Sequence, residues 1–215
     1  MLKTTTLELI KDLIKRYPDL TDTEADITSA VEVLIKCFKK GGKLLVCGNG
    51  GSASDALHIV GELMKDFYFP RPLTDDEKLF IHMSGEDGEY ICENLQRALP
   101  CIALVGSPAI ESAYANDRAP DLCFAQQVFG LGSKGDVLLG ISTSGNSKNV
   151  IYASQVAKSK GMTVIGLTGK TGGKMNDKCD ICLKAPEIET YKIQERHLPM
   201  YHTICLCLEN EFFGK

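Results

Sequence analysis

A run of hydroxyl and glycine residues at 142–147 is the stretch of this sequence best suited to bind a ligand. It reads Ser-Thr-Ser-Gly-Asn-Ser and follows an apolar run, 137–141, that is typical of a buried strand. A helical pattern begins directly after it. Backbone N–H groups at a helix start attract anions, so we predict a phosphate-binding turn. The side-chain hydroxyl donors are those of Ser142, Thr143, Ser144 and Ser147. The alternative is an ordinary helix cap, for which one hydroxyl would suffice.

A second turn of the same kind lies near the N-terminus. Gly48 is followed by Asn49, Gly50, Gly51 and Ser52, between an apolar run and another helical pattern. The strand, small-residue turn and helix therefore occur twice, at 43–67 and 136–160. The first turn lacks the G-x-G-x-x-G spacing of dinucleotide-binding proteins, so we expect no nucleotide cofactor.

Four side chains supply the groups for proton transfer or metal binding. His58 and Glu62 are four residues apart, which places them on one face of a helix. Gln194 and His202 lie in the last helical pattern, expected at about 195–213. A carboxylate and an imidazole suit acid–base chemistry near neutral pH, and both bind zinc. The alternative is an exposed His–Glu pair and a structural histidine, so these residues alone leave the function open.

Composition excludes several classes of protein. The chain has 215 residues, of which 44% are hydrophobic and 24% charged, enough for one globular domain with a substantial core. The net charge of −4, without a basic block, argues against nucleic-acid binding. We see no apolar run of membrane-spanning length and no signal peptide, and therefore expect a cytoplasmic protein that does not bind membranes.

The nine cysteines indicate reduced thiols rather than a disulfide framework, because their number is odd and they are scattered through apolar runs. Cys179 and Cys182 have the spacing of redox or zinc motifs. We expect a strand at 179–183, however, and positions three apart on a strand face opposite sides. We therefore interpret this pair as structural.

Alternation of strands and helices indicates an α/β fold. We predict a three-layer αβα sandwich, flavodoxin-like or Rossmann-like, with a parallel sheet and N-terminal helices. The expected strands are 43–47, 101–105, 137–141, 163–167 and 179–183. Residues 1–215 form one domain in this interpretation, with a helical part at 1–40 and a polar, turn-rich inserted segment at 68–100. Both glycine-containing turns follow strands, where such sheets bind ligands.

These motifs together resemble the sugar isomerase (SIS) domain family, and within it the phosphoheptose isomerases. The resemblance runs from about residue 20 to the end, apart from 68–100. The matching segments are Gly48–Ser52, Asp55–His58 with Glu62, Asn116 and Asp117, Gly135–Ser147, Leu167–Lys170, Gly172 and Gly173, and Ile193–Glu195 with His202.

The resemblance implies an aldose–ketose isomerase that converts sedoheptulose 7-phosphate to D-glycero-D-manno-heptose 7-phosphate through an enediol. Glu62 would be the base and His202 the acid. It implies a homotetramer with sites between subunits, and some members bind zinc with residues matching His58, Glu62, Gln194 and His202. The implied substrate-binding residues are Asn49, Gly50, Gly51, Ser52, Asn116, Asp117, Ser142, Thr143, Ser144, Ser147 and Gln194.

Three departures from the family pattern keep other functions open. The segment 68–100 is longer, Tyr191 stands near where the family has an aspartate that contacts sugar hydroxyls, and Pro199 falls between Gln194 and His202. Because proline disfavours a helix interior, the last helix is expected to start late or to kink. The alternatives are a non-catalytic SIS module that binds a phosphosugar or a protein, and an isomerase of another sugar phosphate.

Overall fold

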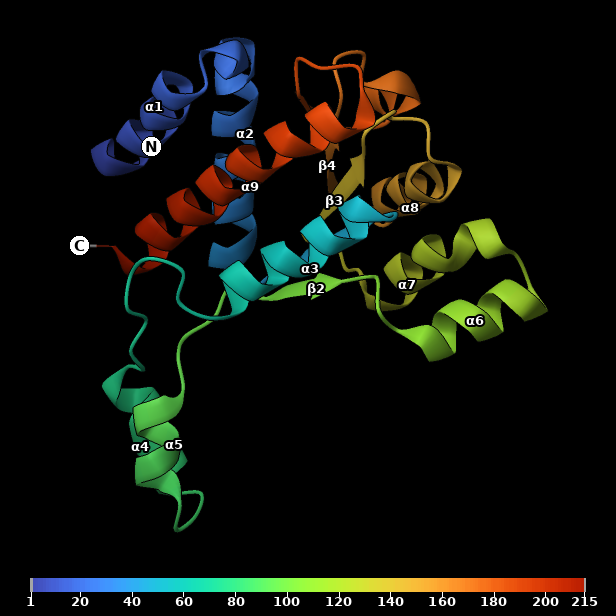
Figure 1. Ribbon diagram of the computed structural model, residues 1–215. Coiled ribbons are helices and arrows are strands. Elements are labelled where there is room, and N and C mark those ends of the chain that lie inside the picture. The colour runs from blue at the N-terminus through green and yellow to red at the C-terminus, as the bar shows by residue number, and fades with distance from the viewer. Residues whose placement is uncertain (1, 215) are drawn as a thin grey trace.

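A five-stranded sheet lies at the centre of the protein, for which a computed structural model describes residues 2–214 (Figure 1). All four pairs of neighbouring strands are parallel. The strands are β1 (Leu44–Gly48), β2 (Cys101–Ala103), β3 (Val137–Ser142), β4 (Thr163–Thr168) and β5 (Ile181–Lys184). The parallel sheet expected from the sequence is thus confirmed.

Helices cover both faces of this sheet. One core cluster joins the sheet to α1 (Thr4–Arg16), α2 (Glu24–Lys39), α3 (Gly51–Met64) and α9 (Thr190–Phe213). The other joins it to α7 (Cys123–Leu131) and α8 (Lys148–Ser159). Side chains alternate along β1, so Leu44 lies in the first cluster and Leu45 in the second. This arrangement is the three-layer sandwich that the alternating pattern predicted.

The strand order brings the two glycine-containing turns together. The order is β2-β1-β3-β4-β5, so the chain changes direction across the sheet between β1 and β3. Gly48 pairs with Ile141 at the carboxyl ends of these neighbouring strands. The Asn49 and Asn149 side chains then exchange hydrogen bonds of 2.9 and 2.8 Å. Ligands of open α/β sheets bind at such a switch in strand order.

The inserted segment, expected to be polar and turn-rich, contains two helices. α4 (Asp75–His82) and α5 (Gly88–Asn94) pack against each other and project from the body (Figure 1). Thr74 caps α4, since its hydroxyl accepts from the Glu77 N–H while the Glu77 carboxylate accepts from the Thr74 N–H. No residue of α4 is buried. A further helix, α6 (Pro108–Asp117), lies between β2 and β3 in the chain.

The last helix begins earlier than expected. α9 runs from Thr190 to Phe213 and continues through Pro199, so the prediction of a start near 195 was wrong. Proline removes one backbone donor from a helix interior. Pro199, Met200 and Tyr201 are buried, and this packing outweighs the local preference. Gln194 and His202 therefore share one helix.

The sequence-based view of Cys179 was also wrong in its geometry. β5 begins only at Ile181, and a bend at Asp180 separates Cys179 from it. A Cβ atom built on Gly166 of β4 would lie 2.6 Å from the Cys179 sulfur and 3.6 Å from the Cys182 sulfur. The two sulfurs therefore converge on one glycine instead of facing opposite sides.

Residues 2–214 also form three short 3-10 helices. They are η1 (Pro18–Thr23), η2 (Pro120–Leu122) and η3 (Gly173–Asp177). Between residues 2 and 214, no helix is both long and apolar enough to cross a membrane.

Candidate active site

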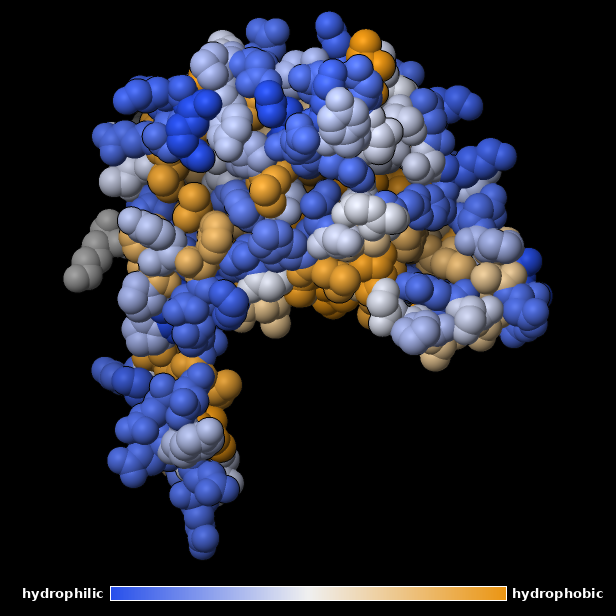
Figure 2. Space-filling model, viewed as in Figure 1, coloured by the Kyte–Doolittle hydropathy of each residue, from blue (hydrophilic) through white to orange (hydrophobic). Residues whose placement is uncertain are grey.

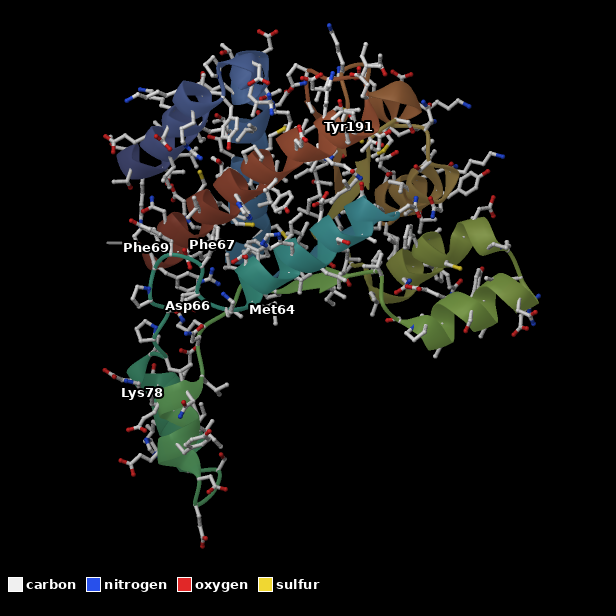
Figure 3. All side chains as sticks on the ribbon, in the orientation of Figure 1. Met64, Asp66, Phe67, Phe69, Lys78 and Tyr191 are labelled. Carbon is white, nitrogen blue, oxygen red and sulfur yellow. The ribbon has the colours of Figure 1, made fainter. Side chains whose placement is uncertain are left out.

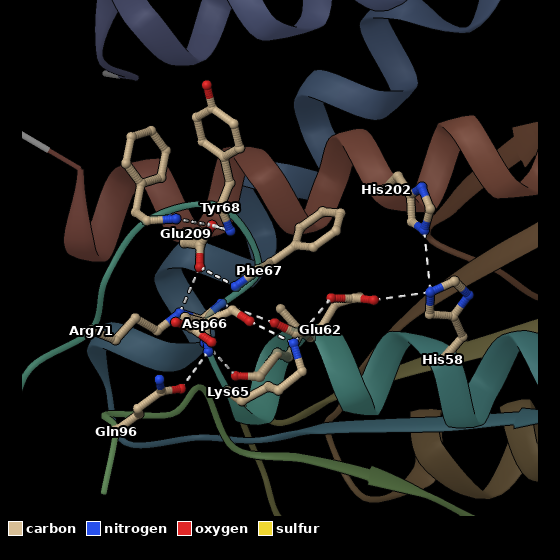
Figure 4. Close-up of polar contacts among 12 residues, drawn as sticks. His58, Glu62, Lys65, Asp66, Phe67, Tyr68, Arg71, Gln96, His202 and Glu209 are labelled. Carbon is tan, nitrogen blue, oxygen red and sulfur yellow. Dashed lines mark hydrogen bonds and ion pairs between the residues drawn. The ribbon is translucent and has the colours of Figure 1, made fainter. Parts of the chain in front are cut away.

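Three of the predicted site residues meet where α3 packs against α9. The His58 Nε2 atom lies 2.9 Å from Glu62 Oε1, and the His202 Nε2 atom lies 3.4 Å from His58 Nε2 (Figure 4). One ligand atom from each residue lies within 4.8 Å of the others. The carboxylate and the two imidazoles thus form a single group.

The apolar stripes of the two helices explain this meeting. Ile59 and Leu63 of α3 are buried, as are Tyr201 and Cys205 of α9, and all four belong to one core cluster. His58, Glu62 and His202 flank these stripes. Burial of the stripes therefore carries the three polar side chains to the rim of the helix contact, where they remain partly accessible.

Two polar groups without a predicted role, Tyr201 and Asp55, hold His58. The Tyr201 hydroxyl donates to Asp55 Oδ1 at 3.2 Å, and its oxygen lies 3.0 Å from His58 Nδ1. With the hydroxyl proton on Asp55, that oxygen accepts from His58 Nδ1–H, which leaves a lone pair on Nε2 for a metal. Tyr201 sits in a core stripe, so only the tertiary contact reveals this role.

Burial also tunes the protonation of the site. It lowers the pKa of His202, an effect strengthened by the neighbouring His58 and opposed by Glu62. Burial likewise raises the pKa of Asp55, against its hydrogen bond from Tyr201 and the charge of His58. A neutral imidazole at His202 is the form that binds a metal and that accepts a proton.

The donor set fits a zinc ion. Zinc takes imidazole nitrogen and carboxylate oxygen in tetrahedral geometry. Two nitrogens that share a tetrahedral zinc lie about 3.3 Å apart, given Zn–N bonds of about 2.0–2.1 Å. The 3.4 Å between the Nε2 atoms of His58 and His202 matches this spacing. Two lone pairs would repel at that distance, so a cation between them is a consistent occupant.

The turn after β3 gathers hydroxyl groups at the start of α8. Ser147 precedes α8 but its side chain makes no capping hydrogen bond, so the simple-cap alternative does not describe it. Instead its hydroxyl lies 2.9 Å from that of Ser142. The Ser144 hydroxyl accepts from the Asn146 N–H at 3.2 Å. The hydroxyls of Ser142 and Ser147 thus converge at the start of a helix.

The segment around η3 braces this turn. Gly145 has φ +64°, and a Cβ there would collide with the Gly172 carbonyl oxygen. The Met175 N–H donates to the Gly145 carbonyl at 3.0 Å, and the Gly169 N–H donates to Thr143 at 2.9 Å. The turn therefore needs a glycine at 145, and the hydrogen bonds from Gly169 and Met175 hold its backbone in place.

Gln194 lies at the opposite end of the site from His202. A Cβ built on Gly51 would lie 2.5 Å from Gln194 Nε2, so the amide covers the first glycine-containing turn. Eight residues of helix separate Gln194 from His202, a rise of about 12 Å. Within one chain the geometry joins Gln194 to the turn rather than to the His–Glu–His group. Ser52, in the same turn, is buried.

The remaining predicted residues stand apart. Asn116 and Asp117 end α6, are exposed, and bond to each other at 2.9 Å. Among the hydrogen bonds of residues 2–214, none links either of them to another predicted site residue. Tyr191 is exposed at the start of α9, far along that helix from the loop at Asp66 and Phe67 (Figure 3).

Comparison with known proteins agrees with this architecture. The SIS domain family model matches residues 8–97 and 92–169. A phosphoheptose isomerase of Burkholderia pseudomallei (strain 1710b) is 40% identical over 191 residues, covering 89% of this chain and 84% of that one. Phosphoheptose isomerase 2 of Campylobacter jejuni is 42% identical over 207 residues, covering 96% and 89%.

Solved structures of phosphoheptose isomerases are also similar to this chain. A phosphoheptose isomerase from Francisella tularensis superposes with a TM-score of 0.75 at 31% identity, covering 93% of this chain and 94% of that one. The enzyme from Neisseria gonorrhoeae gives 0.71 at 33% identity, covering 96% and 94%. The chain therefore belongs to the SIS domain family. Within that family it falls in the phosphoheptose isomerase branch, as the resemblance suggested.

Proposed function

We propose that this chain is an aldose–ketose isomerase that converts sedoheptulose 7-phosphate to D-glycero-D-manno-heptose 7-phosphate. The observation that carries the proposal is the grouping of His58, Glu62 and His202 at 2.9 and 3.4 Å, in a chain that also has a hydroxyl-rich turn before α8. The names of the relatives support the same reaction. Residues 1–215 would act as one SIS domain.

The proposed reaction moves a proton between C1 and C2 of the sugar. Glu62 removes the carbon-bound proton to give an enediol and returns it to the other carbon. His202 gives a proton to the C2 oxygen as the enediol forms and takes a proton from the C1 oxygen as the aldose forms. Asn49, Gly50, Gly51 and Ser52 would line the sugar, together with Asn116 and Asp117.

The phosphate would bind far from the reacting carbons. In the proposal, Ser142, Thr143, Ser144 and Ser147 hold it with hydroxyl and backbone donors at the start of α8. This remote binding supplies free energy for orienting C1 and C2 against Glu62. The turn therefore affects substrate binding, while Glu62 and His202 affect the chemical step.

Zinc is the proposed metal, held by His58, Glu62 and His202. Bound there, it would polarise the sugar carbonyl. Since Gln194 lies about 12 Å of helix away from His202, we propose that it joins a metal site through a neighbouring copy. A homotetramer with sites between subunits meets that requirement.

The surface supports assembly. Figure 2 shows apolar side chains exposed beneath α3 and β2, and Leu57, Met64 and Ile102 of these elements are 53%, 46% and 38% exposed. Contiguous exposed apolar patches mark interaction sites. The cytoplasm is the proposed location, because its reducing conditions suit a chain whose cysteines, all nine, are free thiols.

The test follows aldose formation from sedoheptulose 7-phosphate by NMR, with and without added zinc. Glu62→Gln and His202→Ala should each lower kcat by at least about 100-fold. Glu32→Gln on α2 and His82→Ala on α4, both exposed and outside the site, serve as matched controls. Turnover that survives in Glu62→Gln would refute the assignment of the base.

An inert wild type would favour one of the alternatives. If sedoheptulose 7-phosphate still raised the melting temperature, the phosphate site would stand and the chain would be a phosphosugar-binding module. A panel of pentose and hexose phosphates separates that outcome from an isomerase of another sugar. Tyr191, which replaces an acidic residue of the family pattern, is the reason to include the panel.

A further inference from the structure

A fully buried ion pair lies directly behind the candidate site. Arg71, in the inserted segment, donates from Nε to Glu209 Oε1 of α9 at 2.8 Å, and both side chains are 0% exposed (Figure 4). A buried pair of this kind often adds little stability beyond a well-packed apolar pair. The other contacts of Arg71 and Glu209 therefore indicate the role of the ion pair.

Arg71 caps the helix that carries Glu62. Its Nη1 donates to the Leu63 carbonyl at 2.7 Å and its Nη2 to the Glu62 carbonyl at 2.9 Å. α3 ends at Met64, so these carbonyls belong to its last turn and lack helical partners. A cation at a helix C-terminus also interacts favourably with the helix dipole. One guanidinium thus fixes the backbone of Glu62.

Glu209 fixes the loop that touches His202. Its carboxylate accepts the N–H groups of Phe67 at 2.8 Å, Tyr68 at 2.8 Å and Phe69 at 3.0 Å. The Phe67 ring packs on the His202 ring, with 5.3 Å between centroids. The ion pair therefore reaches Glu62 through backbone carbonyls and His202 through Phe67.

We propose that Arg71 and Glu209 are positioning residues that hold Glu62 and His202 in register for proton transfer. The inference rests on the proposed isomerase function for the roles of those two residues. Three nitrogens of Arg71 serve three acceptors in different directions, a geometry that a planar guanidinium provides and an ammonium does not. Arg71→Lys keeps the charge but loses this fork.

The experiment compares Arg71→Lys, Arg71→Met and Glu209→Gln with the wild type. Because a misplacement of about 1 Å costs roughly 100-fold in rate, we expect kcat to fall about tenfold in Arg71→Lys and about 100-fold in Arg71→Met. KM for the sugar phosphate should change less than about twofold, because the phosphate turn is untouched. Glu209→Gln should fall between the two.

Lys43→Met is the matched control for lost stability. Lys43 pairs with the buried Asp136 at 2.6 Å, at the amino ends of β1 and β3, and neither side chain hydrogen-bonds to His58, Glu62 or His202. The activity of each variant is measured at the same number of degrees below its own melting temperature. If Arg71→Lys and Lys43→Met lose the same stability and the same activity, the pair is merely structural and the proposal is overturned.

A second readout needs no turnover. The ring-nitrogen NMR signals of His58 and His202 should shift in Arg71→Lys, while those of the deeply buried His197 stay in place. Unchanged His58 and His202 signals would refute positioning. If these signals shift but the wild-type enzyme is inert on sugar phosphates, the proposed function fails and the positioning of the two side chains stands.

Discussion

His197 should make the stability of this protein fall in mild acid. The side chain is 0% exposed in α9, and its Nε2–H donates to the Thr168 carbonyl at 3.1 Å. Its Nδ1 is one of two buried side-chain atoms without a hydrogen-bond partner in the chain from 2 to 214. Burial lowers the pKa of His197 from 6.5 to about 4, although the Thr168 hydrogen bond opposes the shift. The folded state therefore holds this imidazole neutral.

The direction of the effect follows from this lowered pKa. Above pH 6.5 both folded and unfolded chains carry neutral His197, and the folded state has its full stability. As the pH falls from 6.5 towards 4, only the unfolded chain takes up the proton, so stability is lost. Lowering the pKa of His197 from 6.5 to about 4 corresponds to roughly 3 kcal/mol of stability over the whole window, of which about 2 kcal/mol is lost by pH 5.

The assay compares the wild type with His197→Gln, whose amide keeps a donor for Thr168 but does not titrate. Urea unfolding at pH 7.5 and pH 5 gives the free energy of unfolding for each protein. Carboxylates titrate alike in both, so the difference between the proteins isolates His197. Between pH 7.5 and pH 5, the wild type should lose about 2 kcal/mol more of its free energy of unfolding than His197→Gln does. A difference that stays constant between the two pH values would refute the neutral, buried imidazole.

Two further predictions concern groups that the tertiary structure revealed. Tyr201→Phe removes the hydroxyl between Asp55 and His58, and should weaken zinc binding about tenfold in calorimetry; equal affinity would mean that Tyr201 only packs. Cys179, followed by the Thr168 hydroxyl, lowers the pKa of Cys182, so iodoacetamide at pH 7 should alkylate Cys182 before the other thiols, which peptide mass spectrometry would show. Buried Cys47, whose pKa burial raises to about 12, is the internal control, and its faster modification would contradict the assignment.

Much of the fold follows from local sequence patterns. The apolar runs at the five strands gave elements within a few residues of those observed, because such runs are typical of strands that are buried on both faces. The errors arose where packing decides. α9 continues through Pro199 because its surroundings are buried, and α6 has no strong apolar period because none of its residues is buried.

The site divides in the same way. The residue types at Ser142–Ser147 and the His58–Glu62 spacing were legible in the sequence, since turn chemistry and helix periodicity are local properties. Which side chains meet was decided by the crossing of α3 and α9, which brings His202 to His58 across 144 residues.

The same holds for the supporting groups. Asp55, Tyr201, Arg71 and Glu209 carry no sequence signal of their role, because each acts through a contact with a distant element. By itself, the sequence determined the layered parallel fold, the two glycine-containing turns and the family. Only the tertiary structure decided how Glu62 and His202 are held, because burial and hydrogen bonding across elements depend on how helices far apart in the chain pack together.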